Sequence, residues 1–267
     1  MSLLIVSNKP TSINDLKYWF DASDVSSMSL TNIGSATASV SSIRDKVNGI
    51  NLPSSGSSQP IYYFNKINNC NSIYFQYTNN QLTAPNDRLS STSITFSSTG
   101  SLYTVTKWGT TYSLNGQYAI DIAPSSRGDS TYGDFNIIYL SPTNYLMLST
   151  KGPSFNTIVG SLTGFTPNGT QSDVNSISVD IFSARNSSSS LSKLHNTNAY
   201  GSRDGYTNAT YSLSTSSNEL TIGDYHHTTP NATGFKGYFC ELIYYTRYLS
   251  DVEHEKVIQY LKSKWIG

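Results

Sequence analysis

The chain has 267 residues, of which 37 % are hydrophobic, 12 % are aromatic and only 13 % are charged. Lysine plus arginine equal aspartate plus glutamate at 17 each, so no net field attracts nucleic acid or an anionic membrane surface. With 20 Tyr and 10 Phe the composition is not that of a disordered chain. We therefore expect one folded domain over residues 1–267.

The N-terminus, which reads MSLLIVSNKP, lacks a basic region followed by a long apolar stretch, so no signal peptide is visible. No apolar run approaches the roughly 18 residues that span a bilayer, and membrane insertion is not expected. Cys70 and Cys240 can form at most one disulfide, and the sequence leaves open whether they pair.

Segments of strand length recur between clusters of Gly, Pro, Asn and Ser, which is the pattern of short strands joined by turns. No long helical stretches alternate with them, so the sequence predicts an all-β sandwich of antiparallel sheets. The expected strands are, in chain order, residues 16–20, 61–64, 72–76, 101–107, 118–122, 135–140, 145–149, 175–182, 219–222 and 237–245. Residues 186–211, which include four consecutive serines, are expected to form a surface loop.

Near the end of the chain the spacing of apolar residues changes from that of a strand to that of a helix. In residues 237–245 apolar side chains occupy both alternating sets, so this strand is expected to be buried on both faces. Its Glu241 must then meet hydrogen-bond donors, because burying an unpaired carboxylate costs several kcal/mol. Ser250 and Glu253 have capping-box spacing, and Val257, Leu261 and Trp265 follow four apart. We expect a short C-terminal helix there, with Glu241 in a structural role.

Two parts of the sequence carry a family pattern. Residues 16–24 read Leu-Lys-Tyr-Trp-Phe-Asp-Ala-Ser-Asp and residues 43–49 read Ile-Arg-Asp-Lys-Val-Asn-Gly. Residues 220–223 read Leu-Thr-Ile-Gly, and residues 235–250 run from Phe-Lys-Gly to Tyr-Leu-Ser. These segments resemble the concanavalin A-like lectin/glucanase superfamily, specifically laminin-G-like modules of extracellular and viral surface proteins. The resemblance implies a two-sheet antiparallel jelly-roll sandwich with adjacent first and last strands.

Glycosidases of that superfamily carry paired glutamates on one strand, because alternation points both side chains into the cleft. The chain has four glutamates, at 219, 241, 253 and 255, and no such pair. Asp121 and Asp180 are expected in strands, but no second aspartate lies two residues from either. Motifs for serine hydrolysis, zinc and phosphate binding are also absent. On this basis we expect the chain not to be an enzyme.

Glycan binding by such a fold uses aromatic rings and a few fixed polar groups. Tyrosines with charged neighbours in expected loops are the candidate ligand residues. They are Tyr132, Asp129, Arg127, Arg203, Asp204, Tyr206, Tyr225 and His226. The adjacent His226 and His227 point to opposite faces of an extended strand and cannot chelate one ion. Asp21 and Asp24 are weak candidates for calcium ligands, with turn capping as the alternative, and no other cofactor is expected.

The sequence supports three hypotheses for the function. In the first, the chain is a non-catalytic, lectin-like module that attaches to a glycan or cell-surface receptor, in an extracellular or virion-surface location. The alternative is a structural virion protein, such as a homotrimeric fibre head or a capsid decoration, that works through protein contacts. A glycoside hydrolase is a third. Arg127, Gly128 and Asp129 form an Arg-Gly-Asp tripeptide that resembles the integrin-recognition motif.

Overall fold

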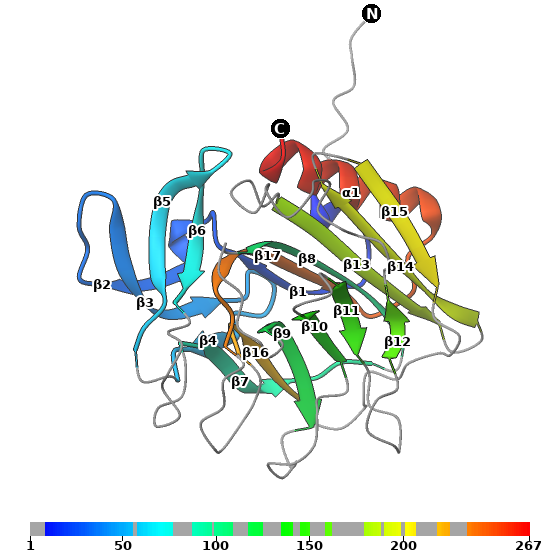
Figure 1. Cartoon of the computed structure of the whole chain (residues 1–267), viewed down its shortest axis with the longest axis horizontal. Helices are drawn as coiled ribbons and strands as arrows, with labels where there is room; N and C mark the ends of the chain where they lie inside the picture. The colour runs from blue at the N-terminus through cyan, green and yellow to red at the C-terminus, as the bar shows by residue number, and fades with distance from the viewer. Residues whose placement is uncertain are drawn as a thin grey trace, which may run out of the picture.

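The computed structural model describes residues 9–55, 58–76, 87–97, 99–108, 117–124, 135–140, 145–149, 158–161, 179–187, 190–198, 201–206, 218–224 and 234–267. In these residues two antiparallel sheets and one C-terminal helix make up the fold (Figure 1). The predicted all-β class with a short terminal helix is thus confirmed.

The larger sheet has eleven strands. Nine follow one another in space as β15 (Gly201–Tyr206), β14 (Ser190–Asn198), β13 (Val179–Ser187), β8 (Gly100–Trp108), β17 (Gly237–Tyr245), β6 (Cys70–Phe75), β5 (Ile61–Ile67), β3 (Thr37–Arg44) and β2 (Met28–Thr31). The other two pair at its sides, β1 (Leu16–Asp21) with β17 and β4 (Asn51–Pro53) with β3. The first and last strands are therefore neighbours, as the family resemblance implied.

The smaller sheet has six strands, in the lower half of Figure 1. Their order is β12 (Ile158–Ser161), β11 (Tyr145–Ser149), β10 (Phe135–Leu140), β9 (Gln117–Pro124), β16 (Asn218–Ile222) and β7 (Leu89–Ile94). Buried apolar side chains of both sheets form one cluster, in which Ile122 and Leu220 of the smaller sheet join Phe75 and Leu242 of the larger. The two sheets therefore share a hydrophobic core.

The helix α1 (Asp251–Trp265) packs on the opposite face of the larger sheet. Its buried residues Val257, Leu261 and Trp265 join Ile243 and Tyr245 of β17 in a second apolar cluster. Short 3-10 turns, η1 (Pro10–Ser12) and η2 (Val25–Ser27), flank β1. The larger sheet is thus covered by the smaller sheet on one side and, over part of its area, by the helix on the other.

Strand β17 is the central example of this double burial. Leu242 and Tyr244 belong to the core between the sheets, whereas Ile243 and Tyr245 belong to the cluster under α1. All four are 0 % exposed. The prediction that the closing strand is buried on both faces is confirmed.

Some expected segments differ. The expected surface loop at residues 186–211 is wrong where the structure describes it, because β13 continues to Ser187 and β14 and β15 follow. These strands are rich in Ser and Asn, yet their ladders pair them with one another and with β8. Strands β2, β3, β4, β7 and β12 were not expected either.

Cys70 and Cys240 are both free thiols. They lie on the larger sheet, in β6 and β17. Within the described residues, no helix is long and apolar enough to cross a membrane.

The N-terminus of α1 has the predicted capping box. The Ser250 hydroxyl accepts a hydrogen bond from the Glu253 backbone N–H at 3.3 Å, and the Glu253 carboxylate accepts one from the Ser250 N–H at 3.0 Å. Both groups satisfy N–H donors that have no partner inside the helix.

Ser250→Ala should lower the free energy of unfolding by about 1 kcal/mol, since the cap acceptor is lost. Urea denaturation measures this change. Ser263→Ala, on the exposed side of the same helix, is the matched control and should leave the midpoint unchanged or raise it slightly, since Ala is the better helix former. Equal effects of the two substitutions would contradict a specific role for the cap.

Candidate functional site

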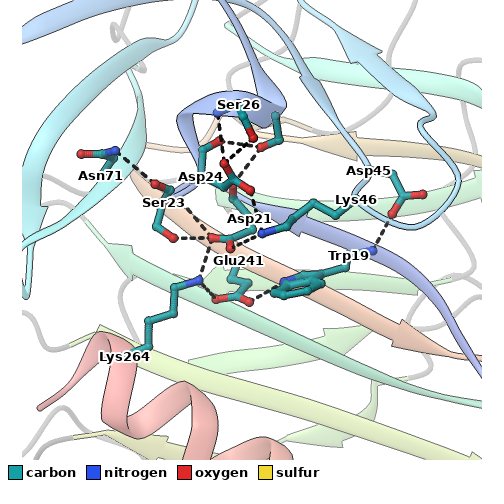
Figure 2. A network of polar contacts seen from close by, with 12 residues as sticks. Trp19, Asp21, Ser23, Asp24, Ser26, Asp45, Lys46, Asn71, Glu241 and Lys264 are labelled. Carbon is teal, nitrogen blue, oxygen red and sulfur yellow. Dashed lines mark hydrogen bonds and ion pairs between the residues drawn. The ribbon is translucent and has the colours of Figure 1, made fainter. Parts of the chain in front are cut away.

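Glu241 lies at the centre of a buried polar network (Figure 2). Its carboxylate is 0 % exposed and accepts four hydrogen bonds. Oε1 accepts from Trp19 Nε1 at 2.6 Å and from the Tyr260 hydroxyl at 2.9 Å. Oε2 accepts from Trp265 Nε1 at 2.6 Å and from Lys264 Nζ at 2.8 Å. The donors come from β1 and α1, so one carboxylate joins the start of the chain to its end.

Asp21 stands opposite Glu241 in the β1–β17 ladder, and Lys264 joins the two carboxylates. Lys264 Nζ lies 2.7 Å from Asp21 Oδ1. Burial raises the pKa of Asp21, but the Lys264 ammonium and other donors outweigh it and hold this pKa below its ordinary value. Burial and the neighbouring Asp21 raise the pKa of Glu241, against the opposing effect of Lys264. The shared ammonium is what allows two acids to lie side by side in a buried site.

Asp21 and Asp24, the weak calcium candidates, cap turns and bind lysines. Asp21 Oδ1 accepts from the Ser23 N–H and Asp24 Oδ1 from the Ser26 N–H, both at 3.0 Å. Lys46 Nζ lies 3.2 Å from Asp21 and 2.8 Å from Asp24 (Figure 2). Across the described part of the chain, no three His, Cys, Asp or Glu residues gather as metal ligands.

The predicted ligand residues do not form one described cluster. Arg203, Asp204 and Tyr206 lie in β15, an edge strand of the larger sheet, instead of in a loop. Asp204 pairs with His195 and Tyr206 with Lys193 of β14. The remaining candidates lie outside the described residues, and their role stays a prediction; they are Arg127, Gly128, Asp129, Tyr132, Tyr225 and His226.

A polar row crosses the smaller sheet on the side away from the core. Neighbours in register on β7, β16, β9, β10 and β11 are all polar. They are Ser90, Thr221, Asp121, Asn136 and Ser149. The adjacent row is entirely apolar and includes Leu89, Ile222 and Ile120 of the shared core. Because successive positions of a strand alternate between its two faces, the positions of the polar row belong to the outer face of this sheet.

Glu219 adds a second acidic position to this face. It precedes Thr221 by two residues, and Thr221 pairs with Asp121. Glu219 and Asp121 are therefore diagonal neighbours on adjacent strands, about 7–8 Å apart at the backbone. We call Ser90, Asp121, Asn136, Ser149, Glu219 and Thr221 the polar face.

The polar face is covered where its exposure is described. Thr221 is 0 % exposed and Glu219 is 5 % exposed, and the Thr221 hydroxyl donates to Glu219 Oε1 at 3.5 Å. A sheet face covered only for stability is normally apolar, because each buried polar group needs a partner. Polar residues concentrated in a covered row are therefore a candidate binding site.

Sequence reasoning missed this pair for a specific reason. It searched for acids two residues apart on one strand, where alternation brings them together. Asp121 and Glu219 are 98 positions apart in the chain (219 minus 121), and only the register of β9 with β16 makes them neighbours. The one feature of the sequence that could have indicated the pair is that both acidic residues lie in expected strands.

The chain resembles several solved structures in fold. An arabinofuranosidase complexed with arabinofuranosyl-α-1,2-xylobiose aligns at a TM-score of 0.55 and 13 % identity, covering 86 % of this chain and 52 % of that one. A botulinum neurotoxin type C structure, whose cell entry depends on two ganglioside molecules, aligns at 0.51 and 12 %, covering 89 % and 51 %. Tailspike protein 2 of Escherichia coli O157:H7 bacteriophage CAB120 aligns at 0.50 and 12 %, covering 78 % and 27 %.

The chain thus spans about half the length of the first two structures and less of the tailspike. At these identities the likeness shows the fold alone. No protein-family profile and no curated protein sequence matches the chain.

The expectation that the chain is not an enzyme is wrong on this comparison. The first of the similar structures is a glycoside hydrolase, so this fold carries catalysis as well as binding. The expectation rested on the absence of a carboxylate pair along one strand, and β9 and β16 supply acidic positions across two strands.

Glu241→Gln should lower the free energy of unfolding by about 3–5 kcal/mol, because Lys264 loses one of its two buried counter-charges and the amide cannot accept all four hydrogen bonds. Thermal denaturation measures the loss. Glu255→Gln, on the exposed side of α1, is the control and should melt like wild type. If Glu241→Gln also melts like wild type but loses ligand binding, Glu241 belongs to a binding site instead of the scaffold.

A pH prediction follows for Asp24. Hydrogen bonds from Lys46 and Ser26 lower its pKa from 3.8 to about 2. The pKa of Asp24 is lower in the folded state than in the unfolded state. The Asp24 carboxylate therefore stabilises the fold fully above the unfolded-state pKa of 3.8, and this stabilisation is lost as pH falls through about 2.

Asp24→Asn keeps the oxygen that caps η2 and removes the charge. The difference in unfolding free energy between wild type and this variant should therefore shrink from pH 5 towards pH 2, as followed by urea melts at each pH. A difference that stays constant over this range would contradict the charge pairing.

Proposed function

We propose that this protein recognises a glycan at the polar face of its smaller sheet. The observation that carries the proposal is the unbroken polar row across five strands, with Asp121 at its centre and Glu219 diagonal to Asp121 on the adjacent strand. Hydroxyl, amide and carboxylate groups in fixed positions are what a saccharide needs for orientation. The fold likeness to an arabinofuranosidase and to a ganglioside-dependent toxin supports this class of ligand.

Hydrolysis is the second candidate, and the diagonal acids favour it. Glycosidases use two carboxyl groups about 5–9.5 Å apart, which diagonal neighbours on adjacent strands can reach. One carboxylic acid protonates the glycosidic oxygen as its bond to the anomeric carbon breaks. The other carboxylate takes a proton from water as the water oxygen bonds to that carbon. Asp121 and Glu219 are the residues we assign to these two roles.

Attachment at the surface of a virion is a further candidate, which the fold likeness to a phage tailspike favours. In this setting we also propose an extracellular location and a jelly roll of the concanavalin A-like kind, supported by the pairing of β1 with β17. A homotrimer stays a prediction. Size-exclusion chromatography with light scattering tests it, and a monomer at micromolar concentration would count against a fibre head.

The polar face is tested with Asp121→Asn and Glu219→Gln, with Asp180→Asn in β13 of the other sheet as the matched control. Binding is measured on a glycan array and by calorimetry with arabinoxylan oligosaccharides. Both polar-face variants should weaken binding at least tenfold if recognition alone is the function, while Asp180→Asn should bind like wild type.

Release of arabinose and of reducing ends is measured in parallel. A hydrolase should lose about 100-fold or more in rate in each polar-face variant, since each acid–base group contributes about 10²–10⁴-fold. Absence of any glycan binding or hydrolysis by the wild type would overturn the proposal. Unchanged activity in both variants would place the site elsewhere.

A further inference from the structure

Three tyrosines meet on the outer face of the larger sheet, the face that α1 covers elsewhere. Tyr63 comes from β5, Tyr74 from β6 and Tyr238 from β17. The ring centroids of Tyr74 and Tyr238 are 4.7 Å apart, and that of Tyr63 lies 5.9 Å from each. All three side chains are half-buried. We call these three residues the tyrosine platform.

Strand register explains the cluster. Tyr238 pairs with Tyr74, and Tyr63 pairs with Ser72, two residues before Tyr74 in the same strand. Cross-strand partners share a face, so Ser72 points to the same side as the three rings. The next residues, Ile73 and Phe75, belong to the core between the sheets, which confirms that the platform faces outward.

Among the described residues, the hydroxyl groups of the platform and of the neighbouring Ser72 have no hydrogen-bond partner. Ser72 is 0 % exposed, and its hydroxyl oxygen has no hydrogen-bond partner among the described residues. In the same part of the chain the three phenol groups contact rings but no hydrogen-bond partner. A buried hydroxyl without a partner is destabilising, so a sequence selected for stability alone favours an apolar residue at position 72.

The electrostatics of the tyrosines agree with this geometry. Burial, together with the adjacent Tyr63 and Tyr74, raises the pKa of Tyr238 to about 12. Burial and Tyr63 raise the pKa of Tyr74. The phenols therefore stay neutral at physiological pH and can each donate and accept a hydrogen bond.

The surroundings limit the kind of partner that can bind. Lys66 Nζ lies 5.6 Å from the Tyr63 ring centroid, and Lys107 pairs with Tyr238 on β8, so N–H donors adjoin the rings. An extended peptide that adds a strand needs a free sheet edge, but Tyr74 and Tyr238 lie on interior strands with neighbours on both sides. A zero net charge offers little to nucleic acid.

A pyranose ring meets these conditions, since its apolar face stacks on aromatic rings and its hydroxyls bond to phenols. We propose that Tyr63, Tyr74 and Tyr238 form a second carbohydrate-binding site, on the sheet opposite the polar face. The inference takes its ligand class from the proposed glycan recognition, but its location and residues are independent of the polar face.

Affinity electrophoresis in gels that contain arabinoxylan, mixed-linkage β-glucan or galactomannan tests the site. The tested variants are Tyr74→Ala/Tyr238→Ala and the single Tyr→Phe changes at 74 and 238, which keep the rings. The control is Tyr248→Ala, a half-buried tyrosine that stacks instead on Arg185 at 5.2 Å. Melting curves verify that each variant is folded.

At least one polysaccharide should retard the wild type, and the double alanine variant should raise the dissociation constant about tenfold or more, as expected for the loss of about 1.4 kcal/mol of ring stacking. The phenylalanine variants should show a smaller loss, and Tyr248→Ala none. If the double alanine variant does not fold, the single phenylalanine variants test the site instead, and an unchanged dissociation constant in both overturns the inference.

The platform is distinguished from the polar face by repeating the gels with Asp121→Asn/Glu219→Gln. Retardation that survives in this background and disappears with the tyrosines supports the second site. Retardation that the tyrosine changes leave intact overturns the inference while the proposed function stands. Lack of retardation of the wild type in all three gels also overturns it, and the glycan array then decides the polar face separately.

Discussion

The carboxylate of Glu241 has no contact with water, and the arrangement of both chain ends depends on it. Its four donors are two indoles, a phenol and an ammonium group, and they reach it from β1 and α1. A charge buried in this way is stable only while all these partners stay in place. The pairing of β1 with β17 and the position of α1 over the larger sheet are therefore linked through one side chain (Figure 2).

This arrangement divides the acidic residues into two kinds. Asp21, Asp24 and Glu241 are held by Lys46 and Lys264, and their hydrogen bonds go to turns, indoles and strands of the scaffold. Positions 121 and 219 lie instead on the outer face of the smaller sheet, in a row of hydroxyl and amide residues. The first group stabilises the fold, and the second is the one to which we assign ligand contacts in the proposed function.

The outer faces of the two sheets also differ in chemistry. On the larger sheet, α1 covers the part around Ile243 and Tyr245 with apolar contacts, while Tyr63, Tyr74 and Tyr238 remain half-buried beyond it. On the smaller sheet, the outer row is polar and Thr221 and Glu219 are buried. The two sites that we propose therefore differ in chemistry: one offers aromatic rings and the other hydrogen-bonding groups, and saccharide recognition uses both kinds of group.

Local interactions were readable from the sequence. The capping box at Ser250, the four-residue spacing in α1 and the double burial of residues 237–245 depend on neighbours within a few positions, and the structure has all three. Strands such as β3 and β14 carry many Ser, Thr and Asn residues, so their strand state comes from the ladders of their neighbours instead of their own pattern. The contacts that matter most are also the longest in sequence: Trp19 meets Glu241 across 222 positions, and Asp121 meets Thr221 only through strand register. Composition and periodicity determined that the chain forms sheets and a terminal helix, whereas only tertiary pairing decided which acids stabilise the fold and which share an outer face.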